Sequence, residues 1–398
     1  MVQKMNYNVV KKVISTVFIC LMVIITFFPD ISSKAFEENE DYTKQINMYY
    51  QFVNNGMHEK ITELYGKGLT DSVKDFFNNQ DNKKNNEGIF NVKNVKILSL
   101  INISEDALDY EDGIDTYSNT KMYFVKCYMD VISPDKYYTQ GVNYFVFNIG
   151  VNTSGEIKIA NLEIPSYQLI DKFDDNESDV KLYKETREKY IYGSSSRLTD
   201  VSSYIDVVKN PSTIRVLYNN TVKVVSFKDY CFRVAAKEMN TINNVNGARA
   251  CAMAIKMFAI HFVNTAASGC NYDIDDKQQV YAEDGTVISS SAKSAVEYVM
   301  NYFLLDRYGA NFKTFYRSKA SISSYCRKNG GILPQIEANA MGTNGSSWQD
   351  ILKYYYTRVS GTSYYNSYMN YGNLIITTQH THNWSNGVNC SSCGALVK

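Results

Sequence analysis

The sequence has no net charge, because 41 Lys and Arg balance 41 Asp and Glu among its 398 residues. A nucleic-acid-binding protein would show an excess of basic residues, so that class is excluded. The hydrophobic share of 44% is ordinary, which excludes a wholly disordered or fibrous chain. A chain of this length supplies two or three domains, each large enough to bury its own core.

Long hydrophobic runs are also lacking, with one exception near the N-terminus. Three lysines precede an uncharged run at 13–28, which at 16 residues is shorter than the roughly 20 that a permanent membrane helix needs. Ser33 and Ala35 then offer the small residues that a signal peptidase recognises. We therefore predict a signal peptide at 1–35, cleaved after Ala35, with a retained membrane anchor as the alternative. The mature chain would be secreted or held in the cell wall, would touch the membrane only if the segment is not cleaved, and would carry a net charge of −3.

A disulfide framework is missing as well. Cys20 lies in the predicted signal, and the seven remaining cysteines are an odd number at scattered spacings. Cys231 and Cys251 stand among apolar residues on predicted helices, so we expect them to be buried thiols.

Two kinds of periodicity predict an α+β domain over residues 36–168. Apolar residues recur every three to four positions over 42–80, as in helices, and alternate over four later segments, as in strands. These predicted strands are 92–103, 121–132, 142–151 and 156–164. We expect an antiparallel meander with helices on one face. The pattern resembles cystatin-like or nuclear-transport-factor-like domains, and such a domain can serve as a binding module or as a spacer.

A charged segment at 169–200 is predicted to be a solvated helix followed by a linker. A second α+β domain at 201–372 and a tail at 373–398 follow. The second domain is expected to open with a hairpin, whose strands at 213–218 and 221–225 are joined by Asn219 and Asn220. Ser226 is a suitable N-cap for a helix that ends near Asn240.

Several motifs of this second domain resemble, in order, the SpoIID/LytB domain family of sporulation proteins and amidase enhancers. They are Glu238-Met239 at a helix end, Arg249, Ala254-Ile255-Lys256-Met257-Phe258, the stretches 272–276 and 279–281, and the helices 292–299 and 348–356. The similarity covers about 211–360. One departure is that 331–338 reads GILPQIEA where the family has a His-Gly loop, so the histidine is absent.

The resemblance implies a peptidoglycan lytic transglycosylase that cleaves glycan strands from which the stem peptides have been removed. Glu238 would then be the single general acid/base, a task that requires a raised pKa. Without the resemblance, Glu238 is an ordinary glutamate on an exposed helix. The alternative function is a non-catalytic glycan-binding protein or amidase enhancer, with a cell-wall amidase as partner.

Four more residues are candidate ligands for the glycan. Arg249 and Lys256 are seven positions apart and share a helix face, so they can bind the lactyl carboxylate of muramic acid or form a solvated basic face. Gln279 and Tyr281 can hydrogen-bond and stack against a sugar.

The tail contains a separate constellation within 14 residues. His380 and His382 shortly precede Cys390 and Cys393, and two imidazoles with a Cys-x-x-Cys knuckle can close a tetrahedral zinc site. Such a site would be structural, because four protein ligands leave no open position. The alternatives are a disulfide between the two cysteines and a disordered tail.

Overall fold

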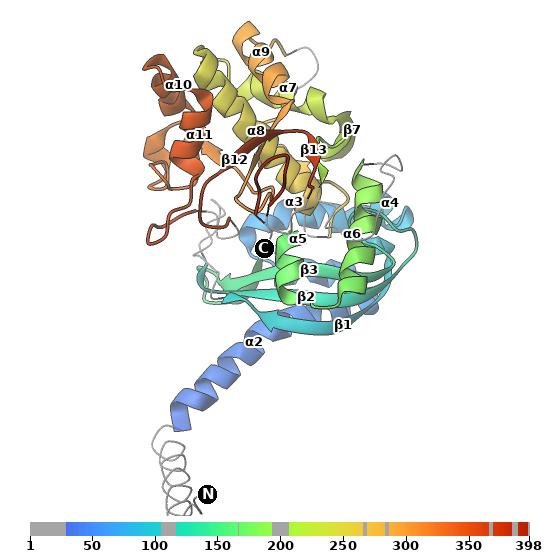
Figure 1. The fold of residues 1–398 in the computed structure, drawn as a ribbon. Helices are drawn as coiled ribbons and strands as arrows, with labels where there is room; N and C mark the ends of the chain where they lie inside the picture. The colour runs from blue at the N-terminus through green and yellow to red at the C-terminus, as the bar shows by residue number, and fades with distance from the viewer. Residues whose placement is uncertain are drawn as a thin grey trace, which may run out of the picture.

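The computed structural model describes residues 29–104, 117–165, 167–192, 207–265, 269–282, 286–365, 369–383 and 389–396. The chain forms two folded parts that lie one above the other in Figure 1, both of them mixed α+β. Most of the predicted signal peptide, residues 1–28, lies outside the described residues. Within the described ranges, no helix combines the length and the apolar character that a membrane span requires.

The N-terminal part is built around a four-stranded antiparallel sheet. Its strands follow one another in space as they do along the chain, which confirms the predicted meander. They are β1 (Val92–Asn102), β2 (Ser118–Val131), β3 (Gly141–Val151) and β4 (Ile157–Glu163).

Helices cover both faces of this sheet, where the sequence pattern led us to expect one covered face (Figure 1). On one side lie α2 (Pro29–Asn54), η1 (His58–Leu64), α3 (Lys67–Asn78), α4 (Gln80–Lys84) and η2 (Gly88–Asn91). On the other lie α5 (Tyr167–Phe173) and α6 (Glu177–Tyr192). Tyr49 of α2 packs on Phe147 of β3, whereas Tyr183 of α6 packs on Tyr144. Tyr144 and Phe147 are three positions apart on β3, so their side chains point to opposite faces of the sheet. Each face is therefore covered by a helix.

The segment predicted as a solvated helix and linker therefore differs from that prediction over residues 169–192. Ile170, Val180 and Tyr183 belong to the core of the N-terminal part. Arg187 is also buried, and its Nε donates to the carbonyl of Lys136 at 2.8 Å. The high charge of these helices concealed a narrow apolar face, which packs on the second face of the sheet.

The C-terminal part opens with the predicted hairpin. Strands β6 (Thr213–Tyr218) and β7 (Thr221–Ser226) pair in antiparallel register, and Asn219 and Asn220 turn the chain at φ 49° and 58°. Positive φ at both turn residues is the geometry of a tight hairpin, which asparagine tolerates. The Ser226 side chain accepts from the backbone N–H of Asp229, so the predicted N-cap is confirmed.

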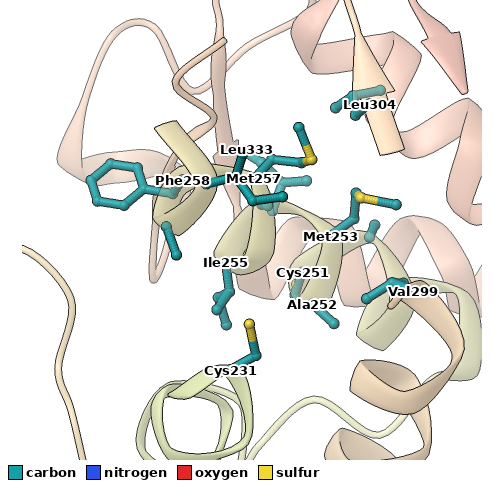
Figure 2. Packing of buried hydrophobic residues seen from close by; sticks show 14 of the residues in the cluster. Cys231, Cys251, Ala252, Met253, Ile255, Met257, Phe258, Val299, Leu304 and Leu333 are labelled. Carbon is teal, nitrogen blue, oxygen red and sulfur yellow. The ribbon is translucent and has the colours of Figure 1, made fainter. Parts of the chain in front are cut away.

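A central helix, α8 (Val245–Thr265), organises the core of this part. Around it pack α7 (Phe227–Glu238), α9 (Ser290–Val299), α10 (Gln335–Thr343) and α11 (Trp348–Tyr356). Figure 2 shows Cys231 of α7 pointing toward α8, which carries Cys251. Both thiols are buried as predicted, and burial raises the pKa of Cys231 to about 12.

Short strands tie the remaining loops together. The pairs are β6 with β8 (Ile274–Asp275), β9 (Tyr302–Leu305) with β12 (Ile375–Thr378), β10 (Phe315–Arg317) with β11 (Ile332–Pro334), and β5 (Val207–Val208) with β13 (His380–Thr381). A short 3₁₀ helix, η4 (Ala320–Ile322), lies between β10 and β11. The tail is therefore part of the fold through β12 and β13.

Candidate functional site

Glu238 is the last residue of α7, and the half-buried position of its carboxylate follows from the helix that carries it. Val234, Ala235 and Ala236 are all buried and anchor the last turn against the core. Met239, which caps the helix, is fully buried as well. The chain thus places an ionisable group at the edge of an apolar core.

One backbone donor holds the Glu238 carboxylate. The N–H of Val280 donates to its Oε1 at 3.0 Å, whereas its buried Oε2 has no hydrogen-bond partner within the described residues. Burial raises the pKa of Glu238 to about 7, although the Val280 N–H and the neighbouring Tyr316 hydroxyl on β10 act to lower it. Near neutral pH this carboxyl can therefore both give and take a proton, as an acid/base residue must.

Gln279 lies behind this pair and is only 1% exposed. Its Oε1 accepts from the Tyr230 hydroxyl at 2.8 Å, and its Nε2 donates to the carbonyl of Ile255 at 3.1 Å and to the Tyr316 hydroxyl at 2.8 Å. Because its amide is occupied within the protein, Gln279 does not sit where a sugar would meet it. It fixes the position of the Tyr316 hydroxyl, which lies near enough to Glu238 to lower the pKa of that carboxyl.

Tyr281 is also buried, with 4% of its surface exposed. Its ring stacks on Tyr230 at 5.7 Å between centroids. Both residues singled out at 279–281 as sugar contacts thus belong to the layer that supports the Glu238 site.

Arg249 and Lys256 share a face of α8, as their spacing predicts, and this face is turned toward α9. Lys256 is fully buried, and its Nζ donates to the carbonyls of Val299 at 3.1 Å, Met300 at 3.3 Å and Tyr302 at 2.5 Å. Burial lowers the pKa of Lys256 to about 7. Lys256 therefore closes the C-terminal end of α9, a favourable place for a cation, and is not free to bind a carboxylate.

Arg249, the other member of this pair, is half-buried. Its guanidinium lies 3.6 Å from the centre of the Tyr298 ring, also on α9. The contact is a cation–π interaction, which leaves the N–H groups at the guanidinium edge able to donate.

Tyr316 was missed in the sequence, where tyrosine is so abundant that one more carried no signal. It comes to Glu238 through β10, which pairs in parallel with β11 in the register Tyr316 to Leu333. Strand β11 and the start of helix α10 form the segment 331–338, which was noted in the sequence for its lack of a histidine. The tyrosine-bearing strand β10 thus lies beside this segment.

The second site gathers the four tail residues named from the sequence. The ligand atoms of His380, His382, Cys390 and Cys393 all lie within 4.8 Å of one another, so this cluster could hold a metal ion. All seven cysteines in the described part are free thiols, so Cys390 and Cys393 are not joined in a disulfide.

The histidine rings are oriented by their outer nitrogens. His380 Nδ1 lies 2.7 Å from the Thr378 carbonyl, and its buried Nε2 has no hydrogen-bond partner within the described residues. His382 Nε2 lies 3.4 Å from the Gly309 carbonyl, while its Nδ1 is 3.5 Å from the Cys393 sulfur. A proton on each outer nitrogen leaves the inner one as a lone-pair donor, which is the arrangement of metal-bound histidines.

Hydrogen bonds also favour the metal-binding form of the Cys390 sulfur. Burial alone would raise the pKa of its thiol, but hydrogen bonds from the backbone N–H groups of Asn383 and Ser392 and from His382 lower it to about 6. The thiolate is the form that a metal binds. The donor set and the outer hydrogen bonds therefore fit a soft divalent ion.

The comparisons with known proteins add no relative to this picture. No protein-family model, no curated protein and no solved structure matches the chain.

Proposed function

We propose that this chain is an exported lytic transglycosylase that cleaves peptide-stripped peptidoglycan glycan strands, with Glu238 as its single acid/base. The observation that carries the proposal is the placement of the Glu238 carboxylate, half-buried at the end of α7, with its Oε1 bonded by the Val280 N–H and its buried Oε2 without a partner within the described residues. The order of the SpoIID-like motifs around it supports the choice of substrate. The interpretation of residues 1–35 as a signal peptide is part of the same proposal.

In this reaction a single carboxyl group acts first as the general acid and then as the general base. Protonated Glu238 gives its proton to the bridging glycosidic oxygen as the bond to the muramic anomeric carbon breaks. The resulting carboxylate takes the proton of the muramic 6-hydroxyl, whose oxygen bonds to that carbon and closes a 1,6-anhydro ring. No water enters, and no second carboxylate is required, unlike in ordinary glycoside hydrolysis. A carboxyl whose pKa lies near 7 suits both steps.

The other residues take positioning roles in this proposal. Gln279 holds Tyr316, and Tyr281 packs on the Tyr230 that bonds Gln279. Lys256 stabilises α9 from inside the core. Of the two cations considered for the lactyl carboxylate, Arg249 is the one that keeps donors for it.

The test is incubation of the mature protein with amidase-treated peptidoglycan and mass spectrometry of the products. We expect anhydromuramic ends, and their loss by at least a hundredfold in rate in Glu238→Gln. Glu297→Gln, a change on the exposed face of α9, is the matched control and should keep the activity. Glycan binding without anhydro products would overturn the enzyme and favour the non-catalytic binding protein or amidase enhancer.

We further propose that the C-terminal cluster binds Zn²⁺ in a structural role. Two thiolates and two imidazoles complete a tetrahedral set, which would tie the tail to the loop at Gly309. Metal analysis of the purified protein should find about one zinc per chain, and Cys393→Ser should lose most of it. Cys326→Ser, which changes a half-buried thiol outside the cluster, should keep the metal. A metal-free protein with an unchanged melting temperature would contradict the site.

A further inference from the structure

A cavity lies between the two folded parts, away from the Glu238 site. Its volume is about 480 Å³, within the range of small-ligand sites. One wall is formed by α3 and α4, which face the C-terminal part in Figure 1, and the other by the β6–β7 hairpin and residues 271–272. The lining residues are Asp75, Phe76, Asn78, Asn79, Asn82, Leu217, Asn220, Thr221, Val222, Asn271 and Tyr272.

The chemistry of this lining is polar but almost uncharged. Five asparagines and one threonine supply amide and hydroxyl groups, and the half-buried Leu217 and Val222 supply apolar surface, while Phe76 and Tyr272 are each only 4% exposed. The single carboxylate is the exposed Asp75, and no lysine or arginine stands among these described lining residues. Amides both donate and accept hydrogen bonds, as a ligand rich in hydroxyl groups requires. The lining therefore offers no cation to bind an anion, and only one carboxylate to bind a metal ion.

Asn271, one of the lining residues, carries a buried acceptor without a partner. The residue is only 5% exposed, and its Nδ2 donates to Glu87 Oε2 at 3.2 Å. Its Oδ1 is buried and has no hydrogen-bond partner within the described residues. A buried acceptor left alone is unfavourable by about 1–3 kcal/mol, and a ligand hydroxyl that reached this atom would remove that cost.

The walls of the cavity are held in place by contacts between the two parts. The N–H of Ile89 donates to the Gly269 carbonyl at 2.8 Å, and Arg215 Nη2 lies 3.4 Å from Glu87 Oε2. Asn79 caps α4 by accepting from the N–H of Asp81 at 2.9 Å. A cavity with such fixed walls binds without a large ordering cost.

We propose that this cavity between α3–α4 and the β6–β7 hairpin is a binding site for a neutral saccharide. Its amides would bond the hydroxyl groups, with Asn271 Oδ1 accepting from one of them, and Leu217 and Val222 would contact the apolar C–H groups of the sugar. The site does not depend on catalysis at Glu238, and it gives the N-terminal part a function as one wall of a binding cleft.

The test is isothermal titration calorimetry of the mature protein with chitotriose and cellotriose, two neutral trisaccharides with and without acetamido groups. We expect at least one of them to bind, and Asn271→Ala and Asn220→Gly each to weaken that binding about fivefold or more, the loss of one neutral hydrogen bond. The matched control is Asn219→Gly. It changes the same turn, whose positive φ glycine accepts, without changing the lining.

Three results would overturn the site. Neither sugar binds at millimolar concentration, or all three variants bind like the wild type, or Asn219→Gly weakens binding as much as Asn220→Gly. Thermal unfolding of each variant separates a lost contact from a lost fold. Because the Glu238→Gln protein should bind the sugar normally, failure here and failure of the proposed catalysis can be told apart.

Discussion

The carboxylate of Asp273 in the C-terminal part lies 2.5 Å from the Nζ of Lys136 in the N-terminal part. Asp273 is fully buried, and it also accepts from the Tyr137 hydroxyl and from the Arg215 N–H, each at 2.8 Å. One buried carboxylate thus satisfies donors from both parts of the chain and joins them.

Asp273→Asn is therefore expected to lower the free energy of unfolding by about 3 kcal/mol, because it leaves the Lys136 ammonium buried without its counter-charge. Urea unfolding measures the change. Asp276→Asn, three residues along and outside this contact, should change stability by less than about 0.5 kcal/mol. Equal losses in the two variants would contradict the role given to Asp273.

Glu238 should make stability depend on pH. Its pKa rises from 4.5 to about 7 on folding, so the unfolded chain loses this proton first and the folded state loses stability as pH rises from about 4.5 to 7. Glu238→Gln removes the titration and should be more stable than the wild type by about 1–3 kcal/mol at pH 8, with little difference at pH 4. Thermal scans across this range measure the difference, and a constant offset would contradict the buried carboxyl.

Lys256 should make the free energy of unfolding increase with pH, which is the opposite of the effect of Glu238, and should do so at higher pH. Its pKa falls from 10.5 to about 7 on folding, so between these values the unfolded chain holds the proton that the folded chain has released. Stability should rise with pH in this window, by about 2–3 kcal/mol over two pH units for this one group.

In Lys256→Met that contribution to the slope should vanish. Lys293→Met, an exposed position on α9, should keep the wild-type slope. Urea midpoints at pH 7, 8 and 9 test the difference, and parallel curves for wild type and Lys256→Met would show that Lys256 is not buried as described.

Gly309 is expected to be essential for the tail site. It has φ +80°, and a Cβ there would lie 2.6 Å from the His382 ring. Gly309→Ala should therefore displace His382, lower the bound zinc and destabilise the protein by about 2 kcal/mol or more. Gly361→Ala is the matched control, because Gly361 has φ +79° but open space around it. Gly361→Ala should lower the free energy of unfolding only through backbone strain, by about 1 kcal/mol, and should leave the zinc content unchanged. The same zinc loss in both variants would show that the close approach of His382 is unimportant.

Local patterns predicted much of the fold. Alternating apolar residues located the four strands of the N-terminal sheet, and Asn219-Asn220 located the hairpin turn, because strand alternation and positive φ are properties of neighbouring residues. The same holds for Ser226 as an N-cap and for the tail cluster, where two histidines and two cysteines fall within 14 residues, a separation that a short loop can close into one site.

Contacts between distant segments could not be predicted in this way. The shared face of Arg249 and Lys256 followed from helical spacing, but nothing local indicated that α9 would cover it. Gln279 was named as a ligand contact, and only the packing of α7, α8 and β10 around it shows that its amide is buried. Tyr316 reaches Glu238 by strand pairing across a segment that carried no motif.

The sequence by itself thus determined the elements, the turn, the caps and the donor set of the tail, because each depends on residues within a few positions of one another. The tertiary structure decided which charges are buried, which residue donates to Glu238, and that two parts of the chain enclose a cavity between them. These outcomes depend on which helix and strand faces pack together, because burial and hydrogen bonding between distant segments arise only from that packing.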